Sequence, residues 1–191
     1  VFILPACLLA VVSIEVSPQR VPSVARDAPP VAFLVERADA SLQSETVEIM
    51  RLAHAELYLA SGFPVADTVR VVYVRRGQSF DSVVGGRFPD WGVAAAVSER
   101  QLIAIRSPAD YPLNRSVRET LRHELAHLHL DALAGMRQVP RWMHEGYAQQ
   151  FAYQWVFGDD LLIARAVFVD KAIDLRDIDG VNSFAGPRAQ L

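Results

Sequence analysis

The sequence predicts one folded domain of the α+β class, in which a small mixed sheet is followed by helices. Three observations support this prediction. A β-rich segment, a long helical pattern and an alternating segment follow one another over residues 31–76, a hairpin pattern occupies residues 92–107, and two helical patterns come after it. With 191 residues, 51% of them hydrophobic, the chain can bury one good-sized core.

The first part of the folded region is expected to form a strand, a helix and a second strand. Residues 31–36, VAFLVE, are a short apolar run rich in β-forming side chains. Residues 39–62 carry apolar side chains at helical spacing, and Gly62 is the expected stop. Residues 67–76, DTVRVVYVRR, alternate well enough to predict a second strand. One face of that strand then carries Val69, Val71 and Tyr73.

The second part is expected to form a hairpin and then helices. After a Gly-containing loop, residues 92–107, GVAAAVSERQLIAIRS, predict two strands that turn around residues 98–100. Helical patterns follow from about Ser116 to Leu133 and from about Pro140 to Phe157, and a further helix is expected near Leu161–Val169. The predicted strands therefore lie in the first part of the folded region, and most of the predicted helices follow them.

The N-terminal segment has the composition of an export signal. Residues 1–16 contain the apolar run VFILPACLLAVVS, which is too short to span a bilayer comfortably and matches a secretory core in length. We interpret it as a signal peptide or membrane anchor, with a buried N-terminal strand as the alternative. Residues 17–30 carry four prolines and predict a linker. The predicted location is therefore periplasmic, extracellular or membrane-anchored.

Charge and cysteine content restrict the classes of partner. The formal net charge is −3, so the chain lacks the basic field that binding to nucleic acid requires, and nucleic acid is not an expected partner. Cys7 is the single cysteine, which excludes an intramolecular disulfide framework. Stability must come from packing and from any bound metal.

The segment RHELAH carries the clearest chemical signal. Ser116 and Glu119 have the spacing of a capping box, which fixes where the helix starts. His123 and His127 are then one turn apart on the same helix face, so that two imidazoles can converge on one zinc ion. Glu124 is rotated by about 100° from His123, where it can act as general base without binding the ion. The alternative is an exposed helix face on which these side chains are merely solvated.

A third ligand is expected in the segment VPRWMHEGYAQQFAYQW. Pro140 suits the start of a helix, and Gly146 would let another backbone approach Glu145 closely. His144 is the competing ligand, although it points elsewhere on the helix. The remaining two histidines are assigned packing or solvated roles: His54 and His129.

From about Val31 to Trp155 the chain resembles the peptidase MA-like domain of gluzincin metalloproteases, through LRHELAHL and VPRWMHEGYAQQF. In that family the glutamate of a P-R-W-x-x-E-G-x-A segment is the third zinc ligand. The resemblance implies a zincin-like fold with His123, His127 and Glu145 as zinc ligands and Glu124 as general base.

The resemblance also implies a domain plan and a substrate site. Residues 31–157 would form the catalytic domain, and residues 158–191 the start of a C-terminal helical lobe. Zincins bind an extended peptide along the edge strand above the active-site helix. An ordinary buried hairpin is the alternative for the residues in question, which are Gly92, Val93, Ala94, Ala95, Ala96 and Val97.

Two positions depart from the family pattern. Relatives commonly carry an acidic residue at the position of Gln149 and a tyrosine at that of Gln150. An amide supports a ligating histidine less strongly than a carboxylate does, and Asp131 could share that task. The group that stabilises the developing oxyanion is left open among four candidates: Tyr147, Tyr153, Arg137 and Arg141.

These features predict an exported zinc peptidase that hydrolyses peptide or protein substrates, with Glu124 deprotonating the attacking water. The alternative is a catalytically inactive gluzincin relative that binds a peptide or an envelope component. The intact Glu124 favours the enzyme, because a binding module has little need of a base beside a metal. A metal-independent structural domain would make the match at PRWMHEG accidental.

Overall fold

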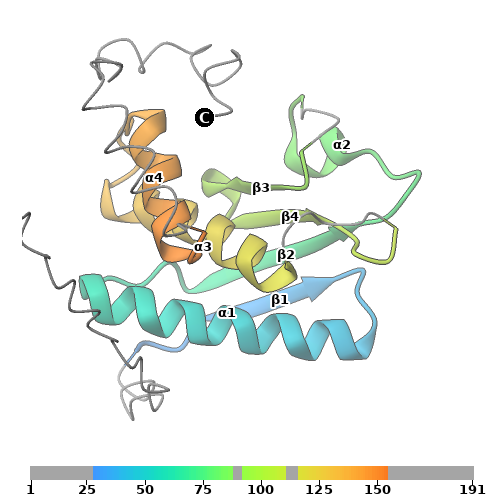
Figure 1. The fold of residues 1–191 in the computed structure, drawn as a ribbon, viewed down its shortest axis with the longest axis horizontal. Helices are drawn as coiled ribbons and strands as arrows, with labels where there is room; N and C mark the ends of the chain where they lie inside the picture. Colours follow the sequence, from blue (N-terminus) through green and yellow to red (C-terminus); the bar gives the residue numbers. More distant parts are fainter. Residues whose placement is uncertain (1–27, 88–91, 111–115, 155–191) are drawn as a thin grey trace, which may run out of the picture.

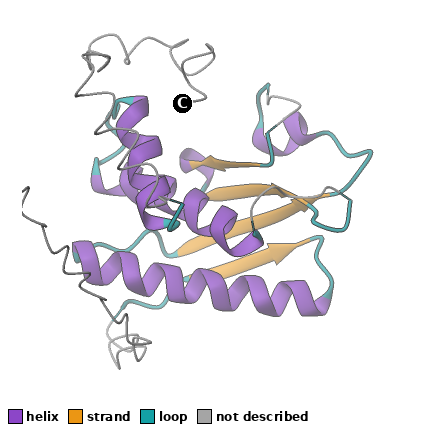
Figure 2. Cartoon of the chain, viewed as in Figure 1, coloured by secondary structure: helices purple, strands orange, loops and turns teal. Residues whose placement is uncertain are grey.

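The computed structural model describes residues 28–87, 92–110 and 116–154 of the chain. Here a four-stranded mixed sheet packs against helices, which confirms the α+β class (Figures 1 and 2). Within these residues, no helix is long and apolar enough to cross a membrane.

Several expectations concern residues outside the described part of the chain. They are the export segment 1–16, most of the linker 17–30, the helix near Leu161–Val169 and the C-terminal lobe 158–191.

The sheet combines a parallel part with an antiparallel edge. Its strand order is β1-β2-β4-β3, in which β1 (Ala32–Glu36), β2 (Thr68–Val74) and β4 (Leu102–Arg106) are parallel. Strand β3 (Ala94–Val97) pairs antiparallel with β4, which confirms the hairpin predicted for residues 92–107, and the turn between the two strands is a short 3₁₀ helix. Among the described strands, β3 therefore lies at one edge and β1 at the other (Figure 1).

Helix α1 (Ala40–Ser61) connects β1 to β2 and has clear local signals at both ends. The Asp39 side chain accepts a hydrogen bond of 2.9 Å from the Leu42 N–H, which caps the first turn. The helix ends at Gly62, whose φ of 75° lies in the left-handed region that glycine adopts without strain. The predicted end of this helix is thus confirmed.

The core lies between one face of the sheet and helices α1 and α3 (Val117–Leu133). Alternate residues of a strand face the same side, so every second residue of β2 and β4 enters this core. The predicted shared face of Val69, Val71 and Tyr73 is confirmed, since all three are fully buried. The other principal members of the cluster come from α1, β4 and α3: Met50, Leu57, Ile103, Ile105, Leu121, Leu125 and Leu128.

A short helix, α2 (Phe80–Val84), lies in the segment for which the sequence predicts a loop. Ser79 caps its start, because the serine hydroxyl accepts a hydrogen bond from the Ser82 N–H, and Gly85 ends it at a φ of 78°. Phe80 is buried beside Val74 on the sheet face opposite the main core. Burial of this aromatic ring supports a helix too short to show a periodic pattern.

Helix α4 (Arg141–Phe151) ends earlier than the predicted boundary at Phe157. The Phe151 carbonyl accepts hydrogen bonds from the guanidinium of Arg122, at 3.3 Å from Nε and 3.0 Å from a terminal nitrogen. Tyr153 then adopts a φ of 57°, which turns the chain out of the helical direction. A contact from another helix therefore sets this end of α4.

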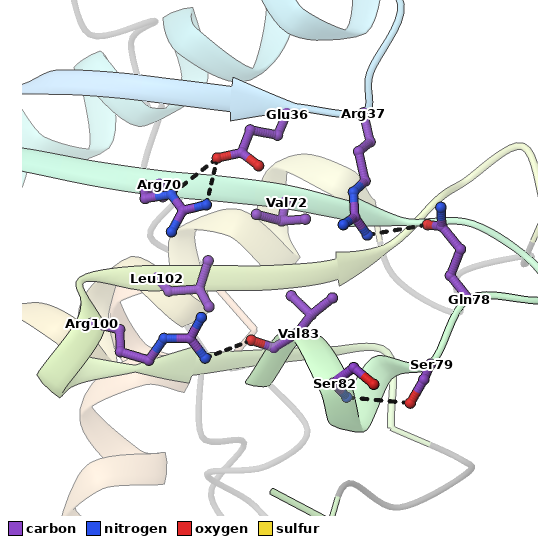
Figure 3. A pocket seen from close by; sticks show the side chains of 10 residues that line it. All are labelled: Glu36, Arg37, Arg70, Val72, Gln78, Ser79, Ser82, Val83, Arg100 and Leu102. Carbon is purple, nitrogen blue, oxygen red and sulfur yellow. Dashed lines mark hydrogen bonds and ion pairs between the residues drawn. The ribbon is translucent and has the colours of Figure 1, made fainter. Parts of the chain in front are cut away.

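A cavity of about 400 Å³ lies on the sheet face away from α3, with Val72 and Leu102 in its lining (Figure 3). Three arginines border it, and each already has a protein partner. Arg70 donates to Glu36 at 2.7 Å, Arg100 to the Val83 carbonyl at 2.7 Å, and Arg37 to Gln78 at 3.3 Å. These contacts join β1 to β2, the turn after β3 to α2, and the residue after β1 to the loop before α2.

Candidate metal centre

Helix α3 begins with the predicted capping box. The Ser116 hydroxyl accepts a hydrogen bond of 3.1 Å from the Glu119 N–H, and the Glu119 carboxylate accepts one of 3.2 Å from the Ser116 N–H. Past the helix end, Gly135 has a φ of 61°. These two signals fix the helical register in which His123 and His127 project from one face.

The structure brings the three predicted metal ligands together. The Nε2 atoms of His123 and His127 lie 3.1 Å apart, and Glu145 Oε2 lies 3.5 Å from His123 Nε2. One ligand atom from each of the three residues falls within 4.8 Å of the others. Because α4 packs beside α3 (Figure 1), the cluster joins two helices and could hold a metal ion.

Gln154 contacts His123 at the opposite side of its ring, and no pattern in the sequence indicates this contact. His123 Nδ1 lies 2.9 Å from Gln154 Oε1. An amide oxygen only accepts, so Nδ1 carries the proton and Nε2 faces the cluster. Gln154 reaches this place because the chain turns after α4, where its N–H donates to the Gln149 carbonyl at 3.0 Å. Gln149 itself is half-buried on α4.

Asp131 and His144 lie behind His127, away from the cluster. Asp131 Oδ1 is 3.0 Å from His144 Nε2, and the other Asp131 oxygen accepts a hydrogen bond from the Ser98 hydroxyl. His144 Nδ1 is 3.3 Å from His127 Nδ1. Asp131 thus reaches His127 through His144. The spacing along α3 pointed to Asp131, but nothing in the sequence pointed to this bridge.

Glu124 lies beside the cluster and under the edge of the sheet. It is 8% exposed, and the backbone N–H of Ala96 on β3 hydrogen-bonds to its carboxylate. The Arg106 N–H donates to the Val93 carbonyl, and antiparallel pairing alternates, so the backbone groups of Ala94 and Ala96 face away from β4. The N–H of Ala96 is therefore on the correct side to meet α3.

Burial dominates the electrostatics of Glu124. Removal from water raises the pKa of its carboxyl to about 7, even though the charge of His123 and the Ala96 N–H act in the opposite direction. A carboxyl that titrates near neutral pH can both accept and return a proton under physiological conditions.

The pKa values of the two clustered histidines, His123 and His127, are shifted in opposite directions. Burial lowers the pKa of His127, and the neighbouring charge of His123 adds to this effect. Burial also acts to lower the pKa of His123, but its hydrogen bond with Glu145 and the charges of Glu124 and Glu145 raise it overall. The Glu145 pKa is lowered, chiefly by the same hydrogen bond. The neutral imidazole of His127 is the form that binds metal.

The four candidate oxyanion donors differ in their surroundings. The Tyr147 hydroxyl lies 2.7 Å from His129 Nδ1, and the Tyr153 hydroxyl donates to Glu56 at 3.3 Å. Arg141 acts on Glu145 through its charge, whereas Arg137 is exposed after α3. Both tyrosine hydroxyls therefore already bind other side chains.

His129 is fully buried and joins three parts of the fold, in keeping with its predicted packing role. Its Nε2 lies 3.2 Å from the Phe63 carbonyl and 3.0 Å from the Ser61 hydroxyl. Because a carbonyl only accepts, Nε2 carries the proton, and Nδ1 accepts from Tyr147. His54 is also buried, with Nε2 3.2 Å from the Pro29 carbonyl.

The burial of His129 predicts a loss of stability in acid. Desolvation lowers its pKa in the folded state, so the unfolded chain binds the proton more readily. The free energy of unfolding should therefore fall as the pH drops below the unfolded value of about 6.5. Urea denaturation in excess chelator at a series of pH values, for the wild type and His129→Gln, measures this. The wild type should lose more stability between neutral and acidic pH than the variant, and equal losses would contradict the prediction.

Comparisons with protein-family models, with curated proteins and with solved structures find no match for this chain.

Proposed function

We propose that this chain is a zinc-dependent peptidase of the gluzincin type, with a zincin-like domain in which α3 is the active-site helix. The observation that carries the proposal is the convergence of His123, His127 and Glu145 beside the buried Glu124. The apolar segment 1–16 supports an exported enzyme, either released or attached to a membrane.

The donor set and its spacing fit zinc. Two histidines and one glutamate are a known ligand set of catalytic zinc sites. In a tetrahedral shell with bonds of about 2.0–2.1 Å, ligand atoms lie about 3.3–3.4 Å apart. The distance of 3.1 Å between the two Nε2 atoms and that of 3.5 Å from His123 to Glu145 bracket this value. Three protein ligands would leave one position open, as catalysis requires.

The zinc ion and Glu124 would have different roles in the reaction. A bound zinc ion would supply a Lewis acid that polarises the scissile carbonyl and acidifies water. Glu124 takes a proton from the attacking water at its carboxylate and passes it to the nitrogen of the leaving amine. In the metal-free chain, burial raises the pKa of the Glu124 carboxyl to about 7, a range in which a carboxyl exchanges a proton readily near neutral pH.

Strand β3 is the proposed substrate edge. The backbone groups of Ala94 and Ala96 face away from β4; the Ala96 N–H is already hydrogen-bonded to Glu124, so an added strand would pair with the Ala94 groups and the Ala96 carbonyl. An extended peptide added along residues 92–97 would therefore run beside the general base. The substrate class that this arrangement supports is a peptide or an unfolded segment of a protein.

The first experiment is a measurement of zinc. The purified full chain should contain about one zinc ion per molecule by plasma mass spectrometry, as expected for a site with three protein ligands. His123→Ala should lose it, and His54→Ala, which removes a histidine elsewhere, should keep it.

If neither the wild type nor the His54→Ala control contains zinc, even after titration with zinc at neutral pH, the metallopeptidase proposal is wrong. A zinc-loaded wild type that cleaves no member of a peptide library would instead favour the non-catalytic binding module.

A further inference from the structure

His144 lies next to the proposed ligand Glu145 in sequence, yet its side chain approaches the back of His127. Its Nδ1 is 3.3 Å from His127 Nδ1, whereas the cluster lies at the opposite nitrogen, Nε2, of His127. His144 is half-buried, and its other ring nitrogen lies 3.0 Å from Asp131. It therefore stands outside the cluster, between a carboxylate and a metal ligand.

The direction of each hydrogen bond follows from the chemistry of the partners. An ionised carboxylate only accepts, so His144 Nε2 donates its proton to Asp131. In a neutral imidazole the second nitrogen is then an acceptor, which leaves His144 Nδ1 to accept from His127 Nδ1–H. With its proton on Nδ1, His127 has a lone pair on Nε2, the atom that faces His123 and Glu145.

We propose that His144, fixed by Asp131, is a positioning residue that selects the metal-binding tautomer of His127. This inference rests on the proposed function, because only a metal site gives this tautomer a use. The tautomer itself can be measured in the metal-free chain. Metal-binding histidines usually donate their outer N–H directly to a carboxylate or carbonyl. Here a second imidazole stands between the ligand and the carboxylate.

Ser98 connects the hydrogen bonds of Asp131, His144 and His127 to the sheet. It begins the 3₁₀ turn (Ser98–Arg100) that follows β3, and its hydroxyl donates to Asp131. Asp131 therefore receives a hydrogen bond from the hairpin and another from α4 while sitting on α3 itself. The same carboxylate that orients His144 thus ties the proposed substrate edge to the helix of the metal ligands.

The test compares His144→Leu with His144→Gln. Leucine fills similar space but cannot accept a hydrogen bond, whereas the glutamine side-chain oxygen can still accept from His127 Nδ1–H. The first readout is long-range ¹⁵N–¹H NMR of the imidazoles in metal-free protein at neutral pH, which identifies the nitrogen that carries the proton. The second is the zinc dissociation constant from chelator competition.

His127 of the wild type should carry its proton on Nδ1. His144→Leu should shift His127 toward the Nε2–H form and weaken zinc binding by about 10–100-fold, the usual effect of losing a partner behind a ligand. His144→Gln should keep the Nδ1–H form and bind zinc within a few-fold of the wild type.

A wild-type His127 protonated on Nε2 would overturn the inference whether or not either variant folds. So would a folded His144→Leu that keeps both the wild-type tautomer and the wild-type zinc affinity. If no form of the chain binds zinc, the proposed function fails, and the NMR spectra still decide whether His144 selects the tautomer.

Discussion

Glu124→Gln is expected to lower the rate of peptide hydrolysis by about 10²–10⁴-fold, the usual contribution of a general acid–base group. The amide keeps the shape of the side chain but cannot accept the proton of the attacking water. Zinc content should be unchanged, because Glu124 is not one of the three clustered residues that could hold the ion. Initial rates on a quenched fluorescent peptide, measured together with metal content, test this.

The matched control is Glu48→Gln, the same chemical change at an exposed position of α1 paired with Arg51. Its rate should equal that of the wild type. Full activity in Glu124→Gln, with one zinc bound, would remove Glu124 from the proposed mechanism. Loss of zinc in Glu124→Gln would show that the carboxylate supports the ion and would contradict its role as a base alone.

The largest expected loss of stability follows from Arg122→Ala. The Arg122 side chain is 7% exposed, and its guanidinium lies 4.5 Å from the ring centroid of Phe151 and 4.6 Å from that of Tyr153. It also donates to the Phe151 carbonyl and forms an ion pair with Glu56 on α1. Removing it leaves a carbonyl without its donor and a gap between three helices.

We expect Arg122→Ala to lower the free energy of unfolding by about 2–3 kcal/mol, mainly through the unsatisfied carbonyl and the lost packing. The ion pair adds little to this figure, since Glu56 is half-exposed. Arg51→Ala is the matched control, because Arg51 is 51% exposed and bonds only to Glu48 among the described contacts. That variant should lose less than about 1 kcal/mol.

Urea unfolding in excess chelator measures both values without a contribution from metal. Similar losses in the two variants would show that the buried guanidinium does not hold α4 in place. If only Arg122→Ala loses stability, this variant should also bind zinc more weakly than the wild type. The reason is that Glu145 and Gln154 reach the cluster from α4 and from the turn after it.

Elements with strong local signals were predictable from the sequence. Asp39 and Gly62 bound α1, and Ser116 caps α3, because each acts on backbone groups within a few residues. The alternation of β2 likewise identifies the face that enters the main core, through Val71 and its neighbours, although Val72 and Val74 on the other face are buried too. His123 and His127 are four residues apart, so their position on one face of α3 also follows from local helix geometry.

Features that depend on contacts distant in sequence were not predictable. The end of α4 depends on Arg122, which lies 29 residues before Phe151. The roles of His144 and Gln154 depend on how α4 docks against α3, and no periodic pattern encodes that docking. Helix α2 is only five residues long, so a period could not appear in it.

The two faces of the sheet support different parts of the molecule. Alternate residues of β2 and β4 point to opposite sides, so Val71 and Ile103 pack beneath the helices that carry His123, His127 and Glu145, while Val72 and Leu102 line the cavity on the other side (Figure 3). Both pairs are nearly fully buried, so a change of side-chain volume is costly on either face. A shift of either strand along its axis would therefore disturb the helices and the cavity at once, and the register of β2 and β4 couples the two sides mechanically.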